Sequence, residues 1–409
     1  MATIDRAAAI RAIVYVCAAQ VLVQIGAFFW PALLPDLMTR WSLTNSEAGW
    51  ITAAFYGAYI VAVPVLVTLT DRIDAKRVYL VGVAMTVAGH ALFAAFADGF
   101  WSALAARALT GVGWAGTYMT GLKLLADKVD GPLLSRAAAG HAASIGISGA
   151  LSFLCADLIA AIGGWRLAFA AAAVSALGAW LLVALAIPGH ARPPAAAPAS
   201  ATYDFRPVLR NRSAMAYAIA YCLHTFEINA LRGWGVAFLG FVAATTGSAA
   251  APLSPAMTLT VFGLLGTLAS VLGNEAAILF GRRRLIALAM IGSAACALLT
   301  GFAGPYSYGL AVVLILIYGP IIWLDSSSLT AGTAGTADPA RRGATLAVHS
   351  MLGYLGGFIG PLAVGWVLDW RGANATGWAT AFTGIAAVMA LALIVFLAMR
   401  PRGLEGDRG

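Results

Sequence analysis

Long apolar segments separated by short polar ones dominate the chain. Each apolar segment has about the 20 residues that a helix needs to cross roughly 30 Å of hydrocarbon. The segments are continuously apolar and do not alternate, which argues against a closed β-barrel. The pattern predicts an all-α membrane protein with twelve transmembrane helices, near residues 12–36, 48–69, 78–97, 101–126, 137–160, 167–187, 214–241, 255–279, 285–304, 308–332, 343–368 and 376–399.

A proline- and alanine-rich stretch with four arginines separates these segments into two sets of six. Such a composition is typical of a solvated linker. We therefore predict an N-terminal six-helix bundle over 1–187, a cytoplasmic linker over 188–212, a C-terminal six-helix bundle over 213–400 and a cytoplasmic tail over 401–409. The charged segments after spans 2 and 8 lie at similar positions in the two halves, which predicts two pseudo-symmetric bundles.

Composition supports a lipid environment. The chain is 61% hydrophobic and 10% charged, whereas soluble domains have about 25% charged residues. With both termini in the cytoplasm, 19 Lys and Arg lie on the inner side and 3 on the outer side. This is the positive-inside pattern of a multi-pass protein, so the net charge of +8 does not indicate nucleic acid. We predict a bacterial inner-membrane protein.

Cofactor and metal chemistry finds no support in the sequence. The four cysteines lie in apolar stretches without paired spacing, so we expect neither a disulfide framework nor a metal site. A phosphate-binding loop and a nucleophile elbow are also missing from the sequence. We expect no cofactor and no enzymatic activity.

Several short motifs point to one family. The loop after span 2 carries Asp71, Arg72, Lys76 and Arg77, and span 4 carries Arg107 followed by Gly111, Gly113 and Gly116. Together with the Gly-Trp-Arg at 164–166, the span-11 segment 357–369 and the duplicated plan, the sequence resembles the major facilitator superfamily over essentially its whole length. It departs from the family at Val67, where a glycine is usual, and at 146–153, where many antiporters have a proline.

The resemblance implies a secondary transporter that works by alternating access around a site near the membrane midplane, with spans 1, 4, 7 and 10 lining the cavity. The arginines and aromatic residues of these spans are the predicted substrate contacts: Arg107, Arg232, Trp114, Tyr118, Phe29, Tyr318 and Trp323. The charged loops predict a cytoplasmic gate of Asp71, Arg72, Arg77, Glu275 and Arg282.

Ionisable residues within the spans are the candidates for proton coupling. Each costs roughly 2.5–3.5 kcal/mol at the centre of a membrane helix, so each needs a partner or a function. Glu227 lies near the middle of span 7, with His224 three residues before it on the same helix face, and Asp325 lies in span 10. The alternative is that these charges only pair with neighbouring helices and lock the bundle.

We predict from these residues a monomeric transporter of a small organic anion, a carboxylate, in symport with protons through Glu227, Asp325 and His224. One alternative is proton-coupled efflux of drugs or amphipathic cations. An alternative of another class is a membrane receptor or sensor that does not transport. The sequence leaves the substrate, the direction and the coupling ion open.

Overall fold

The computed structural model describes residues 6–70, 72–129, 131–189, 205–246, 253–404 and 407, and within them the regular secondary structure is helical. The chain forms two compact units. Unit 1 comprises Met1–Leu33 and Ala54–Pro198, and unit 2 comprises Leu34–Ala53 and Ala199–Gly409. Most of the predicted linker, at 190–204, lies outside the described residues.

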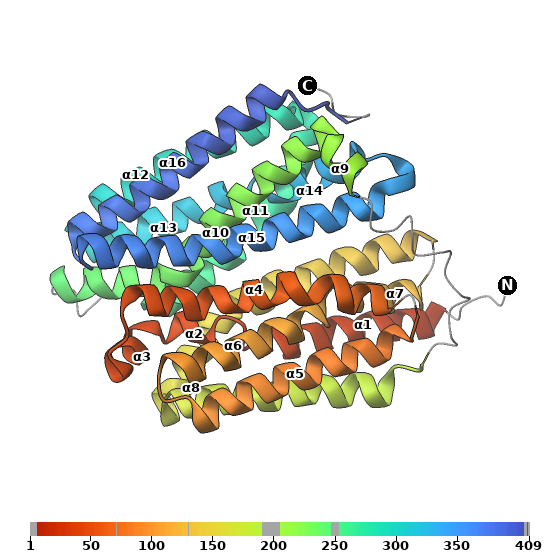
Figure 1. The fold of residues 1–409 in the computed structure, drawn as a ribbon, viewed down its shortest axis with the longest axis horizontal. Helices are drawn as coiled ribbons and strands as arrows, with labels where there is room; N and C mark the ends of the chain where they lie inside the picture. The colour runs from red at the N-terminus through yellow and green to blue at the C-terminus, as the bar shows by residue number, and fades with distance from the viewer. Residues whose placement is uncertain are drawn as a thin grey trace. The chain divides into compact units, whose positions relative to one another are not determined.

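Unit 1 is a bundle of long apolar helices. It contains α1 (Arg6–Gln24), α2 (Phe29–Ala32), most of α4 (Asn45–Leu69), α5 (Ala75–Phe96), α6 (Phe100–Ala115), α7 (Tyr118–Ala126) and α8 (Gly131–Ala186). Within it α8 packs along α1 and α5, and α5 packs along α6 (Figure 1). A cluster of fully buried small and branched side chains from α1, α5, α7 and α8 fills the interior.

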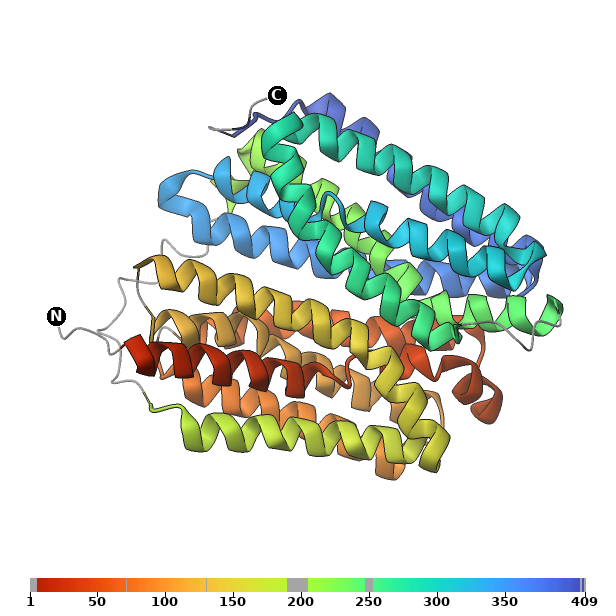
Figure 2. The ribbon, with the colours of Figure 1, turned by 180° about the vertical axis from the view of Figure 1, so that it is seen from behind.

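Unit 2 contains the remaining helices. These are α3 (Leu34–Trp41), the first turns of α4, α9 (Arg206–Arg210), α10 (Arg212–Thr246), α11 (Pro255–Phe280), α12 (Arg282–Ala303), η2 (Gly304–Tyr306), α13 (Tyr308–Trp323), α14 (Ser326–Gly335), η3 (Pro339–Arg341), α15 (Arg342–Arg371) and α16 (Ala375–Met399). Within unit 2, α10 packs along α15 and α16, α12 along α16, and α11 along α13 (Figures 1 and 2). This packing surrounds α10 with protein, which allows it to carry polar residues.

The number of membrane crossings agrees with the predicted twelve. Ten helices among the described residues are long and apolar enough to span a membrane. One of these, α8, has two non-helical glycines inside it, and Gly164 has a φ of 74° that other residues rarely adopt. It therefore makes two crossings, and α6 followed by α7 makes another. The predicted all-α transmembrane fold is confirmed.

Three of the predicted spans are interrupted helices. The first consists of α1, α2 and α3, the fourth of α6 and α7, and the tenth of α13 and α14. In span 7, by contrast, α10 is continuous, and Gly233 and Gly235 do not break it. These glycines instead allow close packing, because a Cβ on Gly233 would lie 3.2 Å from Pro361 and one on Gly235 would lie 3.0 Å from Leu259.

Candidate substrate and proton site

The carboxylate of Glu227 lies in the interior of unit 2. Its helix α10 packs against α13, and Tyr318 of α13 donates a hydrogen bond of 2.6 Å to Glu227 Oε1. Both side chains are fully buried. Ser293 of α12 lies near the carboxylate, but Glu227 Oε2 has no hydrogen bond of ordinary geometry among the described residues. A buried carboxylate with one oxygen unsatisfied is costly. The position therefore keeps an acceptor available for a proton or a ligand.

A second buried contact is formed by His224, which lies one helical turn before Glu227 on α10, and Asp325. Asp325 lies between the end of α13, which contains Pro320 in its last turn, and the start of α14. His224 Nδ1 lies 3.0 Å from Asp325 Oδ1, but the two atoms are not aligned for a hydrogen bond. Asp325 is also close enough to Glu227 for the two carboxylates to interact electrostatically.

An aromatic stack continues from His224 along the same helices. The ring of Tyr221 lies 5.8 Å from that of His224 and 4.0 Å from that of His349, in both cases nearly parallel. His349 of α15 also contacts the hydroxyls of Thr330 and Thr333 at 3.1 and 3.0 Å. Tyr221 was not among the candidates, although its spacing of three residues from His224 was a usable signal.

Arg232, five residues after Glu227 on α10, contacts an aromatic ring. Its guanidinium carbon is 4.7 Å from the centre of the Trp323 ring, a cation–π geometry. Both side chains are partly exposed. The structure therefore brings four of the predicted residues together in unit 2, namely Glu227, Tyr318, His224 and Asp325. It separately pairs Arg232 with Trp323.

Arg107 is held inside unit 1. Its Nη1 donates to the carbonyl oxygen of Ala27 at 3.1 Å, and its guanidinium lies 4.7 Å from the centre of the Phe55 ring. The carbonyl is accessible because the first span is interrupted between α1 and α2. Arg107 is 2% exposed, and its Nε has no hydrogen-bond partner among the described residues. One donor therefore remains for an acceptor other than Ala27.

The aromatic candidates of unit 1 have different surroundings. Trp114 packs edge-on against Phe55 at 5.4 Å and lies 6.5 Å from Tyr118, and both are partly exposed. Phe29 is 1% exposed and packs against Phe169 of α8. Trp114 is thus next to the ring that contacts Arg107, whereas Phe29 belongs to the packed interior. The roles of all three in substrate binding stay predictions.

The predicted gate residues differ in their exposure and in their contacts. Asp71 lies outside the described residues, and Arg72, Arg77 and Glu275 are exposed. Arg282, by contrast, is 3% exposed and forms an ion pair of 3.0 Å with Asp407. Asp407 was not a candidate, because its place in the tail gave no sequence signal of a buried contact.

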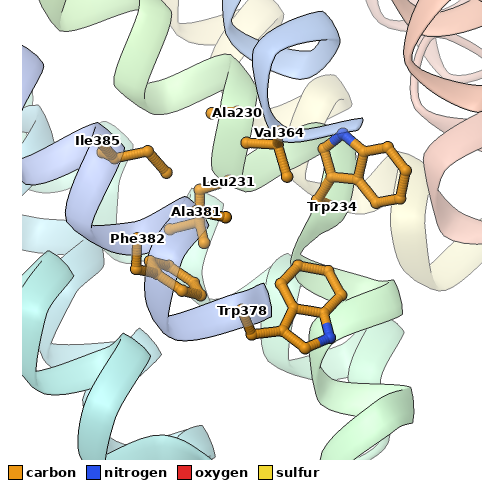
Figure 3. Close-up of a pocket in the computed structure, with 8 residues that line it drawn as sticks. All are labelled: Ala230, Leu231, Trp234, Val364, Trp378, Ala381, Phe382 and Ile385. Carbon is orange, nitrogen blue, oxygen red and sulfur yellow. The ribbon is translucent and has the colours of Figure 1, made fainter. Parts of the chain in front are cut away.

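A small apolar cavity between α10, α15 and α16 has no room for an organic solute. Its volume is about 10 Å³, roughly the space of one water. Figure 3 shows Leu231, Trp234 and Phe382 around it, and the Trp234 indole donates to the carbonyl oxygen of Pro361 at 2.7 Å. We regard this cavity as a packing defect and not as a binding site.

Comparison with known proteins identifies the family. The model of the Major Facilitator Superfamily matches residues 16–319. Human protein spinster homolog 1 is 26% identical over 86% of this chain and 72% of its own length, and protein spinster of Drosophila melanogaster is 24% identical over 54% of this chain and 38% of its own.

Solved structures share the fold. A bacterial homolog of the human lysosomal transporter Spinster, inward-facing and occupied, has a TM-score of 0.75 at 14% identity, covering 95% of this chain and 96% of that one. The nucleoside transporter NupG has a TM-score of 0.72 at 15% identity, covering 95% of this chain and all of that one. The human organic anion transporter MFSD10 has a TM-score of 0.66 at 17% identity, covering 95% and 99%. The chain therefore belongs to the Major Facilitator Superfamily and is a multi-pass membrane transporter, not an enzyme.

Proposed function

We propose that this transporter carries a small organic anion, a carboxylate, together with protons. The observation that carries the proposal is a pair of buried carboxylates in unit 2, Glu227 of α10 and Asp325 between α13 and α14. Arg232 lies on the same helix as Glu227. At identities of 14–17% the solved structures share only the fold, so the choice of substrate rests on the residues of this chain.

Arg232 and Arg107 are the proposed contacts for the anion. A guanidinium offers several N–H donors in a planar fork that fits a carboxylate. Arg232 lies on the Trp323 ring, a contact that holds the group in place without neutralising its charge. Arg107 keeps one unsatisfied N–H among the described residues. Basic groups of this kind do not favour an amphipathic cation as the substrate.

Glu227, Asp325 and His224 are the proposed proton-coupling residues. Two carboxylates in a buried environment are costly to keep charged together, so a proton taken up by one of them lowers the cost. Tyr318 stabilises the charged form of Glu227 through its hydroxyl. We propose that the loaded carrier changes conformation with the cluster protonated, as the two six-helix bundles rock in alternating access.

We further propose that the protein is a monomer of the bacterial inner membrane with both termini in the cytoplasm. Basic residues gather at one end of the helices within each unit. In unit 1, Lys76 Nζ donates to the Ala184 carbonyl at the end of α8 at 2.9 Å. In unit 2, Arg212 of α10 donates to the Ala398 carbonyl near the end of α16 at 2.7 Å. The positive-inside rule places such ends on the cytoplasmic side.

Transport by reconstituted protein tests the proposal. A thermal-shift screen of the purified protein against carboxylates, amino acids and cationic drugs would select a solute for uptake into proteoliposomes. With one proton per anion, a gradient of one pH unit should accumulate the anion about tenfold. Glu227→Gln should abolish this accumulation and leave exchange of labelled for unlabelled anion. Arg232→Ala and Arg107→Ala should each raise KM about 10-fold or more, because each removes a charge-assisted hydrogen bond.

Matched variants separate these effects from a general loss of folding or transport activity. Asp98→Asn makes the same acid-to-amide change at an exposed position where the side chain accepts a hydrogen bond from Ser102, and it should leave accumulation intact. Arg283→Ala removes an exposed arginine and should leave KM unchanged. If Glu227→Gln retains accumulation driven by the pH gradient, proton coupling through this residue is wrong. Unchanged anion uptake in both Arg107→Ala and Arg232→Ala would refute the anion assignment.

A further inference from the structure

Four arginines line a pocket at one end of unit 2, away from Glu227 and Asp325. The pocket has a volume of about 1030 Å³. It lies where α9 leads into α10, α14 ends, and the segment after α16 folds back. Its lining residues are Arg210, Asn211, Arg212, Ser213, Gly335, Thr336, Met399, Arg400, Arg402, Gly403 and Leu404.

Hydrogen bonds hold the walls of this pocket together. Asn211 Nδ2 donates to the carbonyl oxygen of Thr336 at 2.8 Å, which joins the start of α10 to the end of α14. Arg212 joins α10 to α16 through the Ala398 carbonyl. A Cβ on Gly335 would clash with Leu404 at 2.5 Å, so the tail packs directly on the backbone of α14.

The tail after α16 is fixed in the same way. Arg400 ends α16 with a φ of 48°, a left-handed conformation that usually requires glycine or asparagine. This turn directs Arg402 back to α10, where its N–H donates to Ser213 Oγ at 3.1 Å and its carbonyl accepts from the Tyr217 hydroxyl at 2.8 Å. The Arg402 backbone is therefore fixed on both sides, while its side chain remains exposed.

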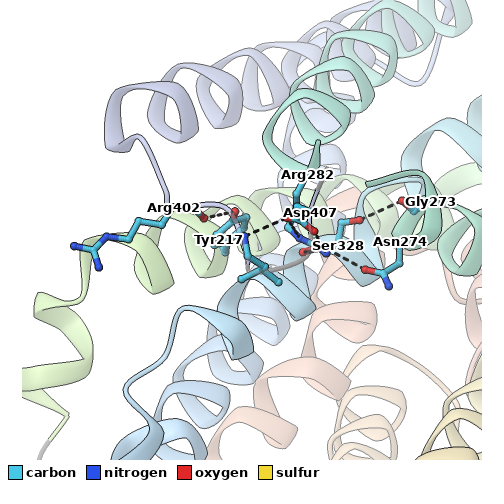
Figure 4. Close-up of polar contacts among 8 residues, drawn as sticks. Tyr217, Gly273, Asn274, Arg282, Ser328, Arg402 and Asp407 are labelled. Atoms are coloured by element: carbon cyan, nitrogen blue, oxygen red, sulfur yellow. Dashed lines mark hydrogen bonds and ion pairs between the residues drawn. The ribbon is translucent and has the colours of Figure 1, made fainter. Parts of the chain in front are cut away.

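The end of the tail is anchored by a buried ion pair. Asp407 accepts from Arg282 Nε at 3.2 Å and from Nη2 at 3.0 Å, and Arg282 Nη1 also donates to Asn274 at 3.0 Å (Figure 4). In Figure 4 the Arg402 side chain points away from Asp407. The carboxylate of Asp407 is thus occupied by Arg282 and does not neutralise the pocket.

Among the residues that the structure describes, the lining is strongly basic and carries no acidic side chain. Within the part of the chain that the structure describes, none of the four arginines forms an ion pair with a carboxylate. Met399 and Leu404 add an apolar wall. A ligand that satisfies this lining has an anionic head with several oxygen acceptors, which suits guanidinium groups, and an apolar portion.

We propose that this pocket binds the phosphate of an anionic phospholipid from the adjacent leaflet. The pocket lies where α10 begins and α16 ends, and the ends of membrane-spanning helices lie at the level of the lipid headgroups. Basic pockets at this level bind anionic headgroups, with about 1 kcal/mol contributed by each Lys or Arg. A free phosphate would meet the same arginines but would gain nothing from the apolar wall.

Thermal unfolding of the detergent-purified protein tests the site. Dioleoylphosphatidylglycerol should raise Tm in a saturable way, whereas dioleoylphosphatidylcholine and inorganic phosphate at the same concentration should not. Arg210→Gln/Arg402→Gln removes two charges, and neither side chain makes a hydrogen bond or ion pair to another residue that the structure describes. This double variant should raise the half-saturating phosphatidylglycerol concentration about 30-fold, at about 1 kcal/mol for each arginine.

The control is Arg283→Gln/Arg284→Gln, which removes two exposed arginines from the start of α12 in the same unit. It should leave the half-saturating concentration unchanged. An equal loss in this control would show that the lipid responds to net charge only and would overturn the site. A full Tm increase with phosphate alone, or equal increases with both lipids, would also overturn it. A lower basal Tm in the double variant does not obscure the result, because the concentration dependence is measured within each variant.

Discussion

At the scale of residues, the buried polar side chains around Glu227 include atoms with a hydrogen-bond partner and atoms without one. Tyr318 satisfies one oxygen of Glu227, while the other oxygen and both ring nitrogens of His224 have no hydrogen-bond partner among the described residues. A network that served only to lock helices would be expected to satisfy its members, since partial satisfaction is worse than an apolar core. The unsatisfied atoms therefore favour a role in binding or proton transfer.

The Tyr318 hydroxyl should contribute to stability through Glu227. Tyr318→Phe leaves the buried Oε1 without its donor, a loss of about 1–3 kcal/mol, and should lower Tm at a fixed heating rate. Tyr79→Phe is the matched control, because Tyr79 is also fully buried but its hydroxyl has no hydrogen-bond partner among the described residues. That variant should unfold at or above the temperature of the unmodified protein. Equal decreases in both variants would mean that the Glu227 contact adds no stability.

The charged residues of unit 2 were predictable from the sequence, whereas their partners were not. Glu227, Asp325 and Arg232 were identifiable because each interrupts an apolar segment. Tyr318 was predicted as a substrate contact, and its bond to Glu227, 91 positions away, depends on how α10 and α13 are rotated against each other. Helical spacing fixes neighbours along one helix, and it carries no information about rotation between two helices.

At the scale of elements, the number of helices was predictable and their interruptions were not. Hydropathy over about 20 residues fixes each crossing, but α6 ends at Ala115 and α13 ends at Trp323 within apolar segments. The glycines near these breaks allow close backbone contacts, such as Gly116 of the fourth span against Gly82 of α5. A glycine at a bend and a glycine at a packing contact look alike in the sequence, and Gly233 and Gly235 of α10 are of the second kind.

A side chain of α15 caps the start of α4 within unit 2, a contact that the sequence did not predict. Asp369, near the end of α15, accepts from the backbone N–H of Asn45 at 2.9 Å and of Ser46 at 2.7 Å. It therefore caps the first turn of α4 from another helix. Asp369→Ala removes both acceptors, which should cost about 1 kcal/mol, the usual value for an N-cap. Hydrogen exchange of a peptide covering 43–50 should then become about fivefold faster.

A comparable cap elsewhere serves as the control. Asn374 caps its own helix, α16, by accepting from the Gly377 N–H at 3.0 Å. Asn374→Ala should accelerate exchange at the start of α16 and leave the 43–50 peptide unchanged. If Asp369→Ala has no effect on that peptide, the contact does not stabilise the first turn of α4.

At the scale of the whole molecule, the same charge pattern appears within each unit. In unit 1, Lys76 and Lys128 donate to backbone carbonyls at the end of α8 and just beyond it. In unit 2, Arg212, Arg402 and Arg282 take part in contacts that join helix ends and the tail. Of these residues, Lys76 and Arg212 donate to carbonyls in the last turns of α8 and α16, where cations are favourable because of the helix dipole.

Labelling of single cysteines tests the proposed orientation for both units. The background replaces Cys17, Cys155, Cys222 and Cys296 with serine. All four labelling positions are exposed: Arg72 and Asp98 in unit 1, and Arg283 and Arg371 in unit 2.

A membrane-impermeant maleimide applied to intact bacterial cells should label Asp98→Cys and Arg371→Cys. It should reach Arg72→Cys and Arg283→Cys only after the membrane is permeabilised. Six crossings separate positions 72 and 283, and an even number returns the chain to the same side of the membrane. Labelling of these two positions from opposite sides would require an odd number of crossings between them, and twelve spans with a cytoplasmic N-terminus would then be wrong. Labelling of both in intact cells would instead keep the twelve spans and reverse the orientation, against the positive-inside rule.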